Sequence, residues 1–556
     1  MMGNGQHKRR VLAIGLDGYE QSLGDRLMAV GELPALARLR SRSARFLLNH
    51  GPAQRTGLAW EHVSSGRSPE AAERWSAVAF DPSTYLIWQE GTSLEPFTAR
   101  LDAPTVVFDT PYFDLDLAPL TRGVVSWGAH DPGVELNARP KNLVAELESR
   151  FGSYPAQEWI YGIVWPSAER TRRMGDALVR ATDLRAEAAS WLLRERLPDW
   201  QLGIVVTGEL HSAIEGLWHG IDPAHPLHHL PSASPAGEGL RAVYRAVDRL
   251  AGKLTETFSD ATVLAFAMGG MGPNRSDIQS MVLLPELLYR QAFEEPLMRE
   301  PEVWASANGC TPMLEEDENW SEAVNAQIHA QRLKAQAQRS WPNLLRSAAS
   351  SLLPGRAKRD ARGAPGKPTR ASGGALRHSL KWMPASRYQP YWHAMRFFAL
   401  PSFYDGRVRI NLAGRERNGK VPLSGYAAAC DEVEEIVRAC RDSATGEAVV
   451  DYIERCGGSD PRTLDPSGSD LVIVWRGAAT GFDHPVLGRV GPVPYRRTGG
   501  HTGPYGMAYV SGEGVTSSDF GVRSSFDVVP TIVELLGESL PPGLSGCSLL
   551  ARGARA

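Results

Sequence analysis

A histidine and a glutamate lie four positions apart near residue 211, and an aspartate ends the first apolar run of the chain. If their stretch is helical, His211 and Glu215 project from one face. An imidazole and a carboxylate at this spacing can share one divalent cation, or they can form a plain hydrogen-bonded pair. Asp17 precedes Gly18, so it stands either at a strand tip that binds a metal or in a common Asp-Gly turn. These residue types point to metal or acid–base chemistry, and the spacing alone leaves the alternatives open.

Short β-branched runs recur along the chain and predict strands that are buried on both faces. They span residues 11–16, 105–108, 124–127, 203–206, 262–267 and 470–475. Amphipathic segments such as 183–197 and 240–258 lie between them and predict helices. Strands that alternate with helices predict an α/β fold with a mostly parallel sheet sandwiched by helices. Sites in such sheets lie beyond the carboxyl ends of the strands, so the residues after each run are candidates.

Several motifs, in chain order, resemble the type I phosphodiesterase/nucleotide pyrophosphatase branch of the alkaline phosphatase superfamily. The matching stretches are 59–69 (AWEHVSSGRSP), 205–226, 267–273 (AMGGMGP), 398–416, 498–506 (TGGHTGPYG) and 527–550. The resemblance covers the chain from residue 11 to residue 550 except for a charged middle. It implies an alkaline-phosphatase-like fold with divalent metals that grip a phosphoryl or sulfuryl group while a Thr or Ser attacks.

The resemblance also implies that the covalent mechanism of the family is lost here. Glu61 stands where the family has its nucleophilic Thr, and Met268-Gly269 stands where it has an Asp-His ligand pair. A carboxylate cannot replace the attacking hydroxyl, and Met and Gly offer no donor suited to a hard divalent ion. Glu61 is then a helix cap, a metal ligand or a general base for water. We expect Glu61 and Asp17 to be the catalytic carboxylates.

The first metal site implied by the resemblance is altered but keeps donors. His211 and Glu215 stand at family ligand positions, and His501 retains the last ligand histidine. With these three residues and Asp17 as metal ligands, we expect at most one divalent ion. We expect zinc, with manganese or iron as the alternatives. The alternative is that His211 and Glu215 form a hydrogen-bonded pair while His501 is a loop residue.

Three further residues are candidates for substrate binding. Arg496 and Arg497 precede the glycines before His501 and can clamp a phosphate or sulfate through bidentate hydrogen bonds. The alternative for this pair is two solvated surface arginines. His62, next to Glu61, is the third candidate.

Composition excludes several classes of protein. Sixty Lys+Arg against sixty-three Asp+Glu give a net charge of −3, so bulk charge does not predict nucleic-acid binding. No apolar run approaches the roughly 18–20 residues that span a bilayer. Five cysteines without a Cys-x-x-Cys pair argue against a disulfide framework or a thiolate zinc site. With no signal-peptide core near the N-terminus, we expect a cytoplasmic protein.

The charged middle divides the predicted core. We expect a polar tail at 1–10, an α/β core in two parts at 11–290 and 391–556, and an insertion at 291–390. The insertion is acidic over 300–322 and basic over 332–381. Its Gly, Pro, Ser and Ala content predicts flexibility over 347–374. It is either a disordered surface loop or a basic arm that contacts an acidic partner, a membrane surface or an anionic substrate.

Together these features predict a divergent hydrolase of a phosphoester or a related small anionic ester. The second hypothesis is a pseudoenzyme that keeps the pocket to bind an anionic ligand or a protein partner. Metal content separates the two, because a pseudoenzyme need hold no stoichiometric metal.

The composition of residues 347–374 predicts that a protease cuts the chain there first, because the segment cannot bury enough apolar surface to offset the cost of ordering. Deleting it should leave the melting temperature nearly unchanged in a thermal unfolding scan. A large loss of stability would show that the segment is packed.

Overall fold

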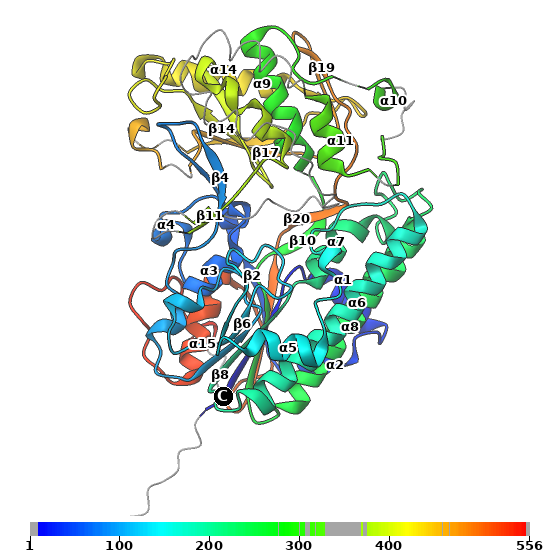
Figure 1. Cartoon of the computed structure of the whole chain (residues 1–556), viewed down its shortest axis with the longest axis vertical. Coiled ribbons are helices and arrows are strands. Elements are labelled where there is room, and N and C mark those ends of the chain that lie inside the picture. Colours follow the sequence, from blue (N-terminus) through cyan, green and yellow to red (C-terminus); the bar gives the residue numbers. More distant parts are fainter. Residues whose placement is uncertain are drawn as a thin grey trace, which may run out of the picture.

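A nine-stranded sheet organises the computed structural model of the chain (Figure 1). The structure describes residues 9–551 except 276, 300, 306–311, 317, 329–368, 371–374, 457, 459, 466 and 467. The strand order is β22-β2-β21-β9-β1-β8-β5-β6-β7. In chain order the strands are β1 (Val11–Leu16), β2 (Ala44–Asn49), β5 (Thr105–Phe108), β6 (Arg122–Val125), β7 (Asn137–Arg139), β8 (Leu202–Thr207), β9 (Thr262–Ala267), β21 (Gly506–Ser511) and β22 (Asp519–Ser524).

The centre of this sheet is parallel. β1 pairs in parallel with β8 and β9, and β5 pairs in parallel with β8 and β6, whereas β21 and β7 run antiparallel to their neighbours. In register, Val11 pairs with Leu202 and with Thr262, so the carboxyl ends of these strands lie at one edge. The predicted α/β class with a mostly parallel sheet is therefore confirmed.

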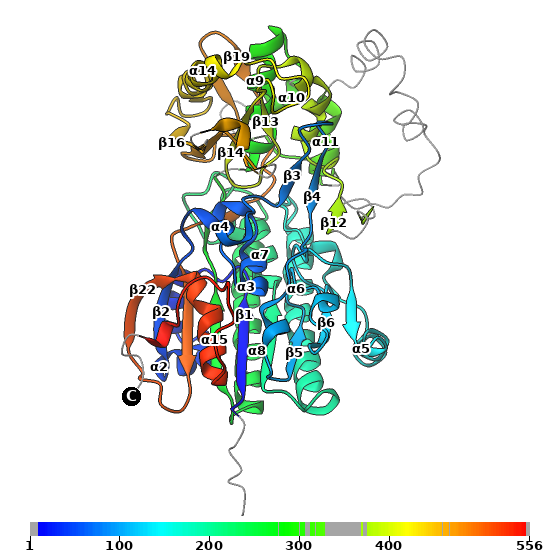
Figure 2. The same cartoon turned by 90° about the vertical axis from the view of Figure 1, so that its left-hand side faces the viewer.

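Helices cover both faces of the sheet (Figure 2). One face packs against α1 (Gln21–Ala29), α2 (Pro34–Ser41), α5 (Leu143–Phe151), α6 (Ala168–Trp191), α7 (Glu209–Leu217) and α8 (Ala233–Thr257). The other face packs against α3 (Ala59–Ser65) and α15 (Val528–Leu536). α8 forms because apolar residues recur every three or four positions, and Leu240, Val243 and Val247 are fully buried as a result.

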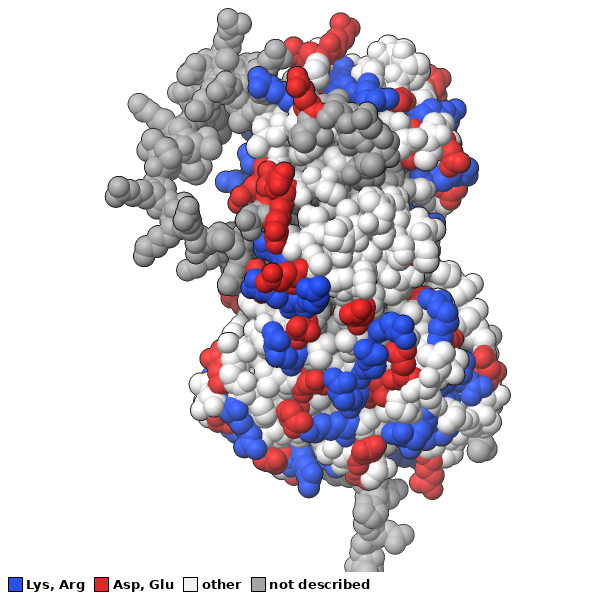
Figure 3. Space-filling view, turned by 90° about the vertical axis from the view of Figure 1, so that its right-hand side faces the viewer, with Lys and Arg blue, Asp and Glu red and all other residues white. Residues whose placement is uncertain are grey.

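Oppositely charged side chains pair across the outer surfaces of α6 and α8. Arg249 of α8 contacts Asp183 of α6 at 2.8 Å, and Lys253 contacts Glu187 one turn further on. Figure 3 shows basic and acidic side chains intermixed over this face of the lower lobe. Such exposed pairs stabilise the fold only weakly, so burial of the apolar faces is the main contribution.

A second lobe stands above the carboxyl edge of the main sheet (Figure 1). Its antiparallel sheet has the order β13-β14-β17-β16, with bounds β13 (Phe397–Leu400), β14 (Gly406–Ile410), β16 (Val450–Arg455) and β17 (Leu471–Trp475). Helices α9 (Leu284–Phe293), α11 (Trp320–Gln327) and α14 (Tyr426–Ala439) share its apolar core. The run 470–475, grouped above with the parallel strands, is β17 of this antiparallel sheet, because an apolar run does not encode strand direction.

A small sheet joins the two lobes, with the order β11-β12-β4-β3. Its strands are β3 (Val78–Phe80), β4 (Ile87–Glu90), β11 (Thr369–Arg370) and β12 (Leu376–His378). Within the predicted insertion 291–390, the described parts also include α10 (Glu302–Ala305) and α11, and Trp320 and Val324 are buried in the second core. The segment 347–374 lies outside the described residues except for β11, and its flexibility stays a prediction. Among the helices of the described chain, none combines the length and apolarity that a bilayer crossing requires.

Candidate metal centre and cavity

Polar residues follow four adjacent parallel strands at the edge that faces the second lobe. Asp17 follows β1, Asp109 follows β5, His130 follows β6, and His211 lies in the first turn of α7, directly after β8. Because these strands are neighbours and end at the same edge, their following residues meet there.

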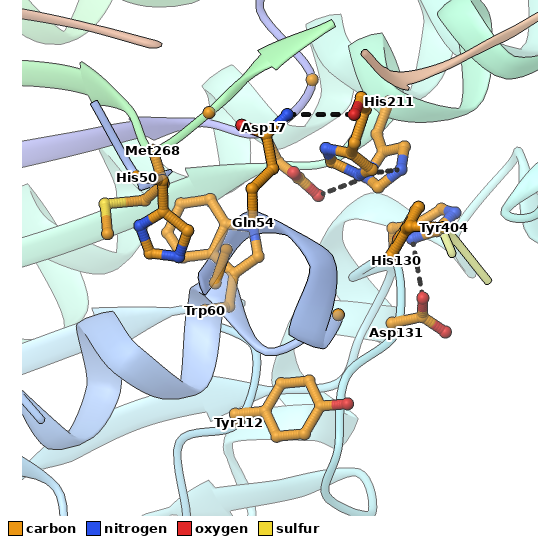
Figure 4. Close-up of a pocket in the computed structure, with 15 residues that line it drawn as sticks. Asp17, His50, Gln54, Trp60, Tyr112, His130, Asp131, His211, Met268 and Tyr404 are labelled. Carbon is orange, nitrogen blue, oxygen red and sulfur yellow. Dashed lines mark hydrogen bonds and ion pairs between the residues drawn. The ribbon is translucent and has the colours of Figure 1, made fainter. Parts of the chain in front are cut away.

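Three of these side chains form a cluster that can hold a metal ion. Asp17, His130 and His211 are buried, and one candidate ligand atom from each lies within 4.8 Å of the others. His211 Nδ1 lies 3.1 Å from Asp17 Oδ2, and the rings of His130 and His211 stack at 3.8 Å (Figure 4). Two imidazoles and one carboxylate are a donor set typical of zinc, iron or manganese. The residues present therefore fit one divalent cation.

His501 reaches this cluster on a two-stranded ribbon. β20 (Gly499–Gly503) pairs with β10 (Gly270–Pro273), and this pairing puts His501 Nε2 3.1 Å from His211 Nε2. The structure thus brings together Asp17, His211 and His501, as expected from the sequence.

Glu215 lies beside the cluster and contacts both of its histidines as well as Arg497. Its Oε1 ion-pairs with Arg497 and lies 3.4 Å from His211 Nε2. Its Oε2 accepts a hydrogen bond from the Gly162 amide at 3.0 Å and lies 3.3 Å from His130 Nε2. Glu215 therefore supports the two histidines in this structure, whereas His130 stands among the possible donors.

Burial and the charges of neighbouring residues together set the pKa values of the cluster. Burial raises the pKa of Asp17, but the charge and hydrogen bond of His211 bring it below its ordinary value. Burial lowers the pKa of His211, yet Asp17 and Glu215 raise it to about 10. Burial raises the pKa of Glu215, but Arg497, His130 and His211 hold it well below the usual range. Burial and the neighbouring His211 lower the pKa of His501 to about 3.

The sequence predictions for Glu61 and His62 require correction. Glu61 does not line the cavity, and its carboxylate ion-pairs with Arg74, which also donates to the carbonyl oxygens of Gly91 and Glu90. A fully buried carboxylate needs such a counter-charge, and burial still raises the pKa of Glu61. His62 is also buried and does not line the cavity. Its Nδ1 lies 3.1 Å from His50 Nε2.

Arg496 and Arg497 are neither free phosphate clamps nor solvated surface residues. Both are nearly fully buried. Arg496 pairs with Asp277 at 3.3 Å and lies over the rings of Trp320 and Trp382, and burial lowers its pKa to about 10. Arg497 forms an ion pair with Glu215. Neither residue lines the cavity.

The cluster faces a narrow cavity of about 50 Å³. Trp60 and Tyr112 form part of the wall, and Tyr404 reaches down from the second lobe to meet the His501 ring edge-on at 5.0 Å. Figure 4 shows Met268 and His50 on the opposite side of Asp17 from His211 and His130. The remaining lining residues are Gly18, His50, Gly57, Ala59, Asp131 and Gly269.

His130 and Asp131 are the site residues that sequence reasoning missed. They follow the run 124–127, so the rule that residues after each run are candidates selects them. No family motif lies there, and no histidine or carboxylate at helical spacing marks the position. Their position after a predicted strand is therefore the one feature of the sequence that indicates them.

Gly18, next to Asp17, packs closely against α7, and a side chain at this position would destabilise the fold. Its φ is +78°, and an added Cβ would collide with the backbone of His211. Gly18→Ala should cost about 1 kcal/mol for the backbone conformation and roughly 1–3 kcal/mol more for the collision. Gly31, at φ +80° with nothing within 4 Å, is the matched control. Equal losses for Gly31→Ala and Gly18→Ala in urea unfolding would contradict the contact with α7.

The burial of His50 predicts that the free energy of unfolding depends on pH. It is buried between Ser525 Oγ at 2.5 Å and His62 Nδ1 at 3.1 Å, and burial lowers its pKa to about 4. Between about pH 6.5 and pH 4 the unfolded chain binds a proton that the folded chain does not, so stability falls as pH falls. We expect His50 to account for roughly 2 kcal/mol of the loss between pH 7 and pH 5.

Urea unfolding at a series of pH values measures this contribution. His50→Gln should flatten the acid limb, whereas His229→Gln, at an exposed histidine, should leave it unchanged. An unaltered acid limb in His50→Gln would show that the imidazole is protonated in the fold.

Comparisons with known proteins add similarities of structure. No family model matches the chain, and no curated protein matches it in sequence. Phosphonoacetate hydrolase from Sinorhizobium meliloti 1021, in complex with phosphonoformate, is similar with 14% identity, 95% coverage of each chain and a TM-score of 0.46. Human ectonucleotide pyrophosphatase/phosphodiesterase 5 is similar with 8% identity, 97% coverage of each chain and a TM-score of 0.43. At these identities and scores the likeness concerns chain arrangement, and no activity, ligand or residue role passes from these proteins to this chain.

Proposed function

We propose that the chain is a hydrolase of a phosphoester or related small anionic ester, with one divalent metal held by Asp17, His130 and His211. The observation that carries the proposal is the buried cluster of these three side chains at the wall of a cavity. His501, beside His211, is available to join them. The motif resemblance supplies the substrate class, and the donor chemistry supports zinc, manganese or iron.

A single ion suits the charges and donors around the cavity. Asp17 and Glu215 are negative and Arg497 is positive, so the centre carries a net negative charge when His211 is neutral. Met268 and Gly269, where the resemblance implies further ligands, offer no hard donor, and Gln54 packs against Gly269. A second ion would lack both donors and compensating charge.

The chain's own residues support attack by water. The hydroxyls near the expected nucleophile are already used: Ser64 donates to the carbonyl oxygens of Trp60 and Pro111, and Ser65 donates to that of Glu61. When bound, a divalent cation would supply a Lewis acid that polarises a phosphoryl oxygen. Asp131 lines the cavity with a side chain 34% exposed, and we assign it the water-activating role expected of Glu61.

The second candidate is a pseudoenzyme that binds an anionic ligand. One observation favours it: the carboxylates of the centre are balanced without any cation, because His211 compensates Asp17 and Arg497 compensates Glu215. The absence of a free hydroxyl at position 61 points the same way.

Metal analysis combined with variants tests the proposal. Purified protein should contain one zinc, manganese or iron per chain by elemental analysis, and it should hydrolyse a member of a nitrophenyl phosphate, phosphonate or sulfate series. His130→Asn should weaken metal binding roughly 100-fold or more, because a ligand is lost. His229→Asn, at an exposed loop histidine, is the matched control.

Two outcomes would contradict the proposal. Protein without stoichiometric metal and without turnover would favour the pseudoenzyme. Full metal occupancy in His130→Asn would exclude His130 and leave the ligand set expected from the sequence. Glu61→Gln should keep its metal, since Glu61 faces Arg74.

A further inference from the structure

A fully buried arginine contacts the segments that precede His130 and His211, but it contacts none of the residues that line the cavity. Arg185 belongs to α6, and its side chain has no exposed surface. Its Nη1 donates to Asp109 Oδ2 at 2.7 Å and to the Val206 carbonyl at 3.1 Å. Its Nε donates to Glu209 Oε1 at 2.9 Å, and its Nη2 donates to the Gly128 carbonyl at 3.1 Å. One guanidinium thus bridges segments that follow or belong to β5, β6 and β8.

Asp109 fixes the loop that carries His130. Its two carboxylate oxygens accept hydrogen bonds from the amides of Trp127 at 2.7 Å and Gly128 at 2.8 Å. His130 follows only two residues later. The Arg185–Asp109 pair therefore anchors the start of the segment from which the His130 ring projects.

Glu209 fixes the beginning of the helix that carries His211. It accepts hydrogen bonds from Thr207 Oγ1 at 2.5 Å and from the Tyr154 hydroxyl at 3.0 Å, in addition to Arg185. Its carboxylate has no exposed surface. His211 lies two residues beyond it in α7.

The loops that follow β5 and β6, both of which contact this network, contain unfavourable backbone conformations. Asp109, Ser126 and Asp131 have positive φ angles of 58°, 63° and 43°, although none is glycine. Such residues cost free energy and persist only where the surrounding contacts dictate them. The buried charges around Arg185 are contacts of this kind.

We propose that Arg185 is a positioning residue that holds His130 and His211 in register with each other, an inference that rests on the proposed metal centre for its functional meaning. Arg185 joins the loop of one histidine to the helix of the other through a rigid, planar fork. A lysine would keep the charge but could not make the same divergent contacts. Removing the fork should loosen the His130–His211 stack at 3.8 Å.

The test compares Arg185→Lys with Arg409→Lys. Arg409 is also fully buried and paired with a carboxylate, Glu416, but it lies in the second lobe. Both variants should lose thermal stability. In histidine-labelled protein, the ring NMR signals of His130 and His211 should shift in Arg185→Lys and stay in place in Arg409→Lys. The zinc affinity, measured by competition with a chromophoric chelator, should fall roughly 10–100-fold in Arg185→Lys alone.

Asp109→Asn serves if Arg185→Lys does not fold. It conserves shape, but it removes the negative partner of Arg185 and one acceptor of the Trp127 and Gly128 amides, so its histidine signals should shift in the same way. Unchanged signals in the folded variant would overturn the inference, and so would equal shifts in Arg409→Lys. The two proposals can fail separately. If the wild-type protein binds no zinc, the proposed function fails, and the NMR signals of His130 and His211 still test the role of Arg185.

Discussion

The buried carboxylates at the carboxyl edge of the main sheet are stable only because each has a positive partner. Removing a charge from water costs several kcal/mol unless another charge and hydrogen bonds compensate it. Asp17 has His211, Glu215 has Arg497, and Glu61 has Arg74. This requirement determines which side chains are free for chemistry and which are committed to the fold.

The strongest example is the Arg185 network. Asp109 and Glu209 would be costly to bury alone, yet together they enclose one guanidinium with no exposed surface. The network reaches the loop after β6 and the start of α7, and so it links charge compensation to the placement of two histidines. The buried charges of this network therefore lie next to both segments that carry the histidines of the candidate metal centre.

Much of the architecture could be predicted from local sequence. The bounds of β1, β5 and β9 agree with their apolar runs, because strands covered on both faces need uninterrupted apolar side chains. Ser64 and Ser65 donate hydrogen bonds to helix and loop carbonyl oxygens, contacts that the local sequence does not encode. The direction of β17 could not be predicted, since partner strands far away in sequence decide it.

The sequence by itself determined the α/β class, the edge of the sheet where polar residues gather, and the candidates Asp17, His211 and His501. These follow from local periodicity, from strand ends and from motif order. Only the tertiary structure decided that Glu61 and Arg497 are committed to ion pairs and that His130 stands beside His211. The physical reason is that a buried charge pairs with whichever opposite charge lies close to it in the folded chain. Distance along the sequence does not predict which segments come into contact.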